Sequence, residues 1–164
     1  MDPTTLTALA AMPAQLQVHY AAIPVKFKRW VPDSWEGIPS ERLTPIEQVC
    51  HVRDIEIEGY QVRFKRTLDE TNPTLPSLDT DALAQERNYS TLDAAEVLAA
   101  FRKARAKTLR LLSGLTPGQL ARPAVFEGYG PVTLKGLIHY LCSHDQQHLA
   151  GLQWLLGKIQ IPNA

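Results

Sequence analysis

The chain has 164 residues, 45% of them hydrophobic and 21% charged, with seventeen basic and seventeen acidic side chains. This apolar share excludes an intrinsically disordered chain, and the balanced charge argues against nucleic acid as a partner, because such binding needs a basic surplus. No apolar run approaches the roughly 20 residues of a membrane span, the N-terminus lacks signal-peptide features, and two cysteines are too few for a disulfide scaffold. These features predict one cytoplasmic domain over residues 1–164 without membrane or nucleic-acid partners.

Helical periodicity dominates the sequence. Apolar residues at every third or fourth position predict a first helix over residues 6–23, in which Pro13 is expected to cause a kink or a break. An irregular stretch over residues 24–43 follows. The sequence TPIE at residues 44–47 then has the form of a capping box with proline at the first helical position. It predicts a second helix that extends to about Leu68.

The second half of the chain contains two more predicted long helices. A loop over residues 71–90 leads to a third helix at about 92–114, and a second capping-box pattern at 116–119 opens one short turn. After a glycine-containing loop, Thr133 is expected to cap a last helix that ends near Gly157. No alternation with a period of two is sustained, which predicts no sheet. Four principal helices joined by long connections favour an all-α four-helix bundle.

Two histidines of the last helix, His144 and His148, are placed by the helical period on its apolar face. At about 100° per residue, His148 lies about 40° from His144, among leucines, whereas His139 faces the opposite, polar side. Each buried imidazole needs partners for both ring nitrogens, and two protonated rings one turn apart would repel. A divalent metal resolves both problems, since neutral imidazoles four residues apart can chelate one ion.

A third ligand is sought on the second helix, where His51 is followed one and two turns later by Asp54 and Glu58. Two interpretations of this polar stripe remain open. It is either a solvated face, because the densest apolar face of this helix is centred elsewhere, or one side of a metal site. In the second case Asp54 and Glu58 are the candidate catalytic residues, able to add a ligand, accept a proton or orient His51. Asp145 is a further candidate for orienting a ligand.

The sequences HVRDIEIEGY at residues 51–60 and HDQQHLAGL at residues 144–152 together resemble the DinB-like superfamily. This resemblance extends over most of the chain and implies an up-down-down-up four-helix bundle that assembles as a homodimer. It also implies a divalent metal ion, zinc, nickel or iron, bound by His51, His144 and His148.

Two features depart from the family pattern. Many relatives end the fourth-helix motif with a His-His pair, whereas Gln147 precedes His148 here. The long connection over residues 72–90 is not a family signature either. The resemblance therefore implies no particular substrate.

Relatives in this superfamily include bacillithiol transferases and mycothiol-dependent maleylpyruvate isomerases. The resemblance thus implies a metal-dependent transferase that adds a low-molecular-weight thiol, its cosubstrate, to a small electrophilic substrate. Three neutral histidines leave an open position on the ion, where a thiol or a water loses its proton at neutral pH. A hydrolase that uses water at the same site, and a non-catalytic metal-binding protein, remain as alternatives.

Overall fold

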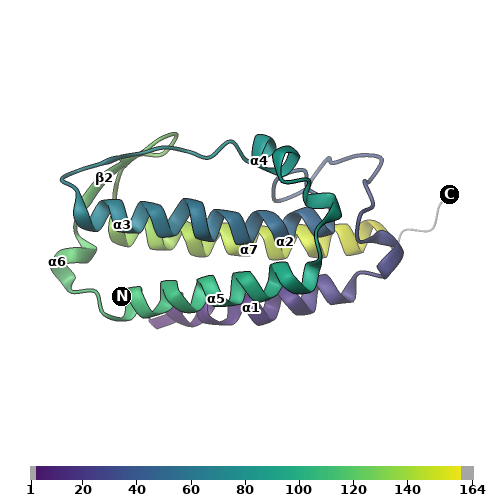
Figure 1. The fold of residues 1–164 in the computed structure, drawn as a ribbon, viewed down its shortest axis with the longest axis horizontal. Coiled ribbons are helices and arrows are strands. Elements are labelled where there is room, and N and C mark those ends of the chain that lie inside the picture. Colours follow the sequence, from purple (N-terminus) through teal and green to yellow (C-terminus); the bar gives the residue numbers. More distant parts are fainter. Residues whose placement is uncertain (1–2, 160–164) are drawn as a thin grey trace.

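The computed structural model describes residues 3–159, most of which lie in four long helical segments (Figure 1). The first and last segments, α1 and α7, run in one direction, and the two middle segments run in the opposite direction. This order confirms the predicted up-down-down-up four-helix bundle. The bounds of the long segments are α1 (Pro3–Ala22), α2 (Pro45–Asp54) continued by η2 (Ile55–Tyr60) and α3 (Gln61–Asp69), α5 (Ala94–Ser113) and α7 (Leu134–Ile159).

The predicted helix starts at Thr44 and Thr133 are confirmed. The Glu47 carboxylate accepts a hydrogen bond of 2.8 Å from the Thr44 backbone N–H, which completes the capping box. The Thr133 hydroxyl accepts a hydrogen bond of 3.1 Å from the Gly136 N–H. Short elements fill the connections between the long helices: η1 (Val25–Phe27), α4 (Thr80–Glu86), η3 (Tyr89–Thr91) and α6 (Pro117–Leu120).

Helix α1 continues through Pro13, so the chain does not break at this residue, and the alternative of a kink stays a prediction. Proline lacks the N–H that would bond to the carbonyl four residues earlier, which is that of Leu9. In the structure the Leu9 carbonyl instead accepts a hydrogen bond of 3.0 Å from Nη1 of Arg105, on α5. The donor lost at Pro13 is therefore replaced from a neighbouring helix.

A small sheet lies at one end of the bundle, where the sequence predicted none. Strand β1 (Thr74–Leu75) pairs in parallel with β2 (Pro123–Phe126), which pairs in antiparallel fashion with β3 (Gly130–Thr133). Strands of two to four residues are too short for an alternating pattern to be visible in the sequence. The prediction of no sheet is therefore wrong, although the helical bundle itself is confirmed.

The second helical segment contains a π-helical turn, η2, directly after the stretch that carries His51. Such turns are rare, and they occur frequently at functional sites. Because a π turn is wider than an α turn, angles calculated at about 100° per residue do not hold across it. The direction of side chains in α3 therefore could not be calculated from the α2 residues.

The apolar core forms two groups along the bundle, with a layer of polar side chains between them. On α7 the buried leucines up to Leu141 belong to one group, and Leu149 and Leu152 belong to the other. His144, Asp145 and His148 lie between these two groups. Within the described residues, no helix has the length and apolar character to cross a membrane.

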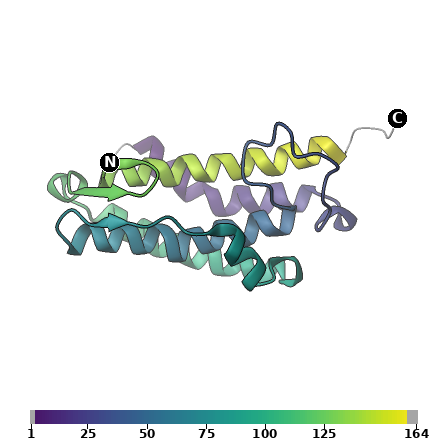
Figure 2. The same cartoon turned by 90° about the horizontal axis from the view of Figure 1, so that it is seen from above.

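The connection between α1 and α2, residues 23–44, loops over α7 (Figure 2). The Trp35 ring stacks on Trp154 of α7 with 6.3 Å between the ring centroids. This contact holds an irregular stretch of chain against the helix that carries two of the predicted metal ligands.

Candidate metal centre

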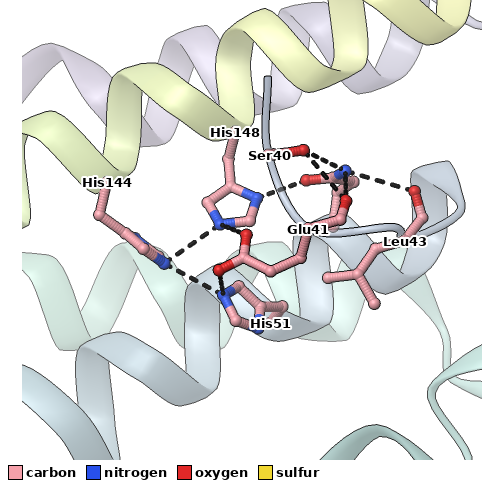
Figure 3. A network of polar contacts seen from close by, with 7 residues as sticks. Ser40, Glu41, Leu43, His51, His144 and His148 are labelled. Atoms are coloured by element: carbon pink, nitrogen blue, oxygen red, sulfur yellow. Dashed lines mark hydrogen bonds and ion pairs between the residues drawn. The ribbon is translucent and has the colours of Figure 1, made fainter. Parts of the chain in front are cut away.

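Three histidines from two helices direct their Nε2 atoms toward one point in the polar layer (Figure 3). Nε2 of His144 lies 3.0 Å from Nε2 of His51 and 3.1 Å from Nε2 of His148. His51 and His148 are almost completely buried. The structure thus brings together the three residues that the sequence and the resemblance proposed as metal ligands.

The His148 ring is oriented by Gln48, one turn before His51 on α2. Nε2 of Gln48 faces only acceptors, among them the Ser40 hydroxyl at 2.8 Å and the Leu43 carbonyl at 3.3 Å. This leaves the Gln48 Oε1 atom to accept a hydrogen bond from Nδ1 of His148. With its proton on Nδ1, His148 presents an unprotonated Nε2 to the other two rings.

The surroundings disfavour protonation of His51 and His144. Burial, together with the neighbouring His148, lowers the pKa of His51 to about 3. Burial also holds the pKa of His144 well below its ordinary value, with contributions from His148 and His51. A neutral imidazole has one N–H group, and its other nitrogen is an acceptor. When neutral rings face one another at this distance, acceptor nitrogens meet with too few N–H groups to form hydrogen bonds between them.

This geometry fits a shared metal ion. Two nitrogens that each lie about 2.1 Å from one ion are about 3.0–3.4 Å apart when the angle between them is about 90–109°. The measured separations of 3.0 and 3.1 Å lie in that interval. Neutral imidazole is also a ligand that zinc, nickel and iron accept.

A fourth group of the cluster, Glu41, comes from the connection between α1 and α2. Its carboxylate lies 3.1 Å from Nε2 of His148 and 3.7 Å from Nε2 of His51. The candidate ligand atoms of Glu41 and the three histidines all lie within 4.8 Å of one another. Burial alone would raise the pKa of Glu41, but the adjacent side chains of His148 and His51 lower it to about 2.

No pattern in the sequence marks Glu41 as a site residue, because it lies in an irregular stretch without periodicity. Its position depends on the close packing of this stretch against α7. A Cβ atom on Gly151 would clash with the Ser40 hydroxyl and would lie 3.1 Å from Nε2 of Gln48. The absence of a side chain at residue 151 therefore lets Ser40 and Glu41 approach the histidines.

The carboxylates proposed as catalytic candidates, Asp54 and Glu58, are not part of this cluster. Asp54 accepts a hydrogen bond of 2.6 Å from the Tyr89 hydroxyl and pairs with Arg53 and Arg87. Glu58 pairs with Arg87 at 2.6 Å. Both acids are thus occupied by arginines, and the structure gives them the contacts of a structural ion-pair group.

Burial also decides between the two interpretations of the polar stripe on the second helix. His51 is 2% exposed and Asp54 is 3% exposed, so the interpretation as a solvated face is wrong.

Asp145, the other carboxylate considered, pairs with Arg105 at 2.6 Å, and the structure shows no hydrogen bond between it and a histidine. His139 is exposed, as the helical period predicted.

A cavity of about 200 Å³ opens beside the cluster. Its walls include Glu41, His51 and His144 on the side of the candidate metal centre. The remaining lining comes from η2, α3, the connection after α3 and the turn between β2 and β3. Residues that contribute from these parts include Tyr60, Arg63, Ser77, Leu78, Phe126 and Tyr129.

A four-helix bundle of this order, with a His/Glu cluster beside a cavity, is the architecture of a metal-binding bundle protein. The family model of the DinB superfamily matches residues 5–152, and the chain belongs to this superfamily. The resemblance seen in the sequence is therefore confirmed.

A solved structure of YfiT from Bacillus subtilis superposes with a TM-score of 0.83 and 21% sequence identity, covering 97% of this chain and 90% of that chain. YfiT is described as a probable metal-dependent hydrolase with an unusual four-helix bundle topology. At this identity the likeness shows a shared fold. No curated protein matches the chain.

Proposed function

We propose that the protein is a metal-dependent enzyme that binds a divalent ion through His51, His144 and His148. The observation that supports this most directly is the convergence of three imidazole nitrogens beside an accessible cavity. Three protein nitrogens with further positions open are typical of catalytic zinc sites, whereas structural sites are closed by four protein ligands. Because imidazole accepts several ions, zinc, nickel and iron all remain candidates.

Glu41 is the residue best placed to handle a proton in such a reaction. Its carboxylate is kept ionised beside His148 and faces the cavity. A divalent ion, when bound, lowers the pKa of a water or thiol next to it. Glu41 takes up the proton that this nucleophile loses and, because its pKa is low and its side chain is 41% exposed, releases it to solvent. This is the role for which Asp54 and Glu58 were first considered.

The first candidate nucleophile is a low-molecular-weight thiol, which the resemblance to thiol transferases of the superfamily supports. In this reaction the thiol proton passes to Glu41 and the sulfur forms a bond to an electrophilic carbon of a small substrate. The leaving group departs from that carbon with the electron pair of the broken bond.

Water is the second candidate nucleophile, and two observations favour it. The cavity of about 200 Å³ accommodates a small substrate and a water more readily than a substrate together with a thiol cosubstrate. The structurally similar YfiT is described as a probable metal-dependent hydrolase. Water would lose one proton to Glu41 while its oxygen attacks a carbonyl or phosphoryl centre, and the bond from that centre to the leaving group breaks with its electron pair departing on the leaving group.

One experiment separates these functions from each other and from a non-catalytic role. The purified chain is loaded in turn with zinc, nickel and ferrous iron, and bound metal is measured by elemental analysis. The loaded protein then receives a panel of small electrophiles and esters, with and without added thiol. Turnover only with thiol supports transfer, and turnover without thiol supports hydrolysis. Failure to retain any ion, or retention without turnover of any substrate, would contradict the proposed enzyme.

The proposal also includes a single-domain homodimer in the cytoplasm. The family resemblance supports the dimer, and the free thiols of Cys50 and Cys142 suit a reducing compartment. Light scattering of the purified chain, coupled to size exclusion, is expected to give twice the chain mass of 18.3 kDa. A mass of one chain across a range of concentrations would contradict the dimer.

A further inference from the structure

The cavity beside the histidines contains a buried arginine without a carboxylate partner. Arg63 is 5% exposed and forms one hydrogen bond in the described structure, of 3.2 Å from Nη2 to the Pro76 carbonyl. Its Nε atom is buried and has no hydrogen-bond partner. No carboxylate of residues 3–159 forms an ion pair with it.

The guanidinium of Arg63 is held in place by its neighbours. It lies 4.5 Å from the centroid of the Phe126 ring and 5.2 Å from that of the Tyr60 ring. Contacts of this kind orient the plane of an arginine side chain. A Cβ atom on Gly59 would lie 2.8 Å from Nη1 of Arg63, so this conformation depends on glycine at residue 59.

The other deeply buried arginine shows what a cation in this interior ordinarily requires. Arg105 is 1% exposed and pairs with two carboxylates, Asp145 and Glu56. Burial of Arg63 without such a partner is unfavourable and lowers the pKa of its guanidinium. Since Arg63 lines the cavity, a ligand in the cavity can provide the missing negative charge.

We propose that Arg63 binds a carboxylate group of the substrate, so that the enzyme acts on a small carboxylic acid. The inference rests on the proposed function, because the same cavity places the reactive part of this substrate beside His51 and His144. The planar fork of arginine matches the two oxygens of a carboxylate. A phosphate dianion fits less well, because Arg63 is the sole arginine or lysine in the lining and Glu41 adds a negative charge there.

The test measures binding of propionate to the full-length chain, both metal-free and zinc-loaded, by calorimetry and by the NMR signal of the Arg63 Nε–H. Propionamide, which is neutral and of the same shape, and inorganic phosphate are the comparison ligands. Propionate is expected to bind with or without zinc and to shift the Arg63 signal. Propionamide and phosphate are expected to bind about tenfold more weakly or worse, given the strength of a charge-assisted hydrogen bond.

Two variants probe the assignment independently. Arg63→Met is expected to weaken propionate binding about tenfold or more, and the matched change Arg110→Met, at an exposed residue of α5, is expected to leave it unchanged. Gly59→Ala keeps the charge but displaces the guanidinium, and it is expected to weaken binding as well. The alanine variant is informative even if the loss of a buried arginine prevents Arg63→Met from folding.

The outcomes separate this inference from the metal-centre proposal. Zinc content is measured in every variant, and Arg63→Met and Gly59→Ala are expected to retain the wild-type stoichiometry. Equal propionate binding in wild type and both variants would overturn the carboxylate assignment while leaving the metal centre intact. Binding only in the zinc-loaded form, or phosphate binding as tight as propionate binding, would also overturn it. Absence of zinc from the wild type would instead contradict the proposed function.

Discussion

Two groups of polar side chains share the middle of the bundle, and they differ in whether their donors and acceptors are matched by groups of the protein itself. Around Arg105, the guanidinium donates to Asp145, Glu56 and the Leu9 carbonyl, and the Thr108 hydroxyl donates to the remaining Glu56 oxygen. Around His144, three imidazole nitrogens and the Glu41 carboxylate face one another.

The comparison shows how a structural polar group differs from a binding site. Buried polar atoms are stable when donors and acceptors are matched. The Arg105 group nearly achieves this match with groups of the protein itself, whereas the histidine cluster brings acceptors together, an arrangement that suits a bound cation. We therefore expect changes in the first group to affect folding and changes in the second to affect metal binding.

The largest expected effect comes from breaking the Arg105 group. Arg105→Met leaves Asp145 and Glu56 buried without a cation and removes the donor to the Leu9 carbonyl. A loss of about 3–5 kcal/mol in the free energy of unfolding is expected, measured by urea denaturation with a chelator and with zinc. The matched control Arg102→Met, at an exposed residue of α5, is expected to change stability by less than about 0.5 kcal/mol. A loss confined to the zinc-loaded form would contradict a structural role.

The next largest effect is expected from removing a ligand. His148→Ala should lower zinc affinity by more than about 100-fold, because loss of a direct ligand exceeds the loss of an orienting group. Elemental analysis and competition with a chelator provide the measurement. His139→Ala, on the same helix but exposed, is the control and should bind zinc normally. Unchanged stoichiometry and affinity in the His148 variant would count decisively against the site.

A smaller effect is expected at Gln48, which orients His148 without belonging to the cluster. Gln48→Leu should reduce zinc affinity about 10–100-fold, measured by the same competition. Gln48→Glu retains an acceptor for Nδ1 of His148 but not the donor to Ser40. Recovery of affinity in the glutamate variant would assign the effect to the orientation of the ring, whereas wild-type affinity in the leucine variant would refute it.

The smallest effect is expected at Gly151, where the α1–α2 connection touches α7. In Gly151→Ala, a gain of about 1 kcal/mol in helix propensity opposes a clash of about 1–3 kcal/mol, so a net loss of about 1 kcal/mol is expected. Zinc affinity should fall only a few-fold. Gly157→Ala, with no atom within 4 Å of the added Cβ, should be stabilised in the same thermal-melt comparison. Equal behaviour of the two variants would show that the close approach at Gly151 is unimportant.

Local signals were enough to predict the bundle. The helical period and the two threonine caps lie within single segments, and they placed His144 and His148 on the buried face of the last helix. The short strands, the π turn and the continuity of α1 at Pro13 depend on contacts between segments, which a local pattern does not record.

The candidate site was predictable only in part for the same reason. Spacing alone favoured a solvated face for His51, and the family resemblance corrected this. Glu41 and Gln48 depend on how an irregular connection packs against α7, and Arg63 lies beyond the π turn. Asp54 and Glu58 share the helix of His51, but a local pattern could not show that Arg87, more than 25 residues later, is their partner.

The parallel course of the two middle helical segments has a consequence for how this architecture can change. A chain that must return the whole length of the bundle after α3 needs a long crossover (Figure 1). Ser77, Leu78 and Thr80 of that crossover form one wall of the cavity. This wall can lengthen, shorten or exchange side chains without shifting either helix that carries the imidazoles. Part of the cavity lining is thereby carried by a piece of chain that holds none of the three histidines, so the shape of the cavity can change while the histidine cluster is preserved.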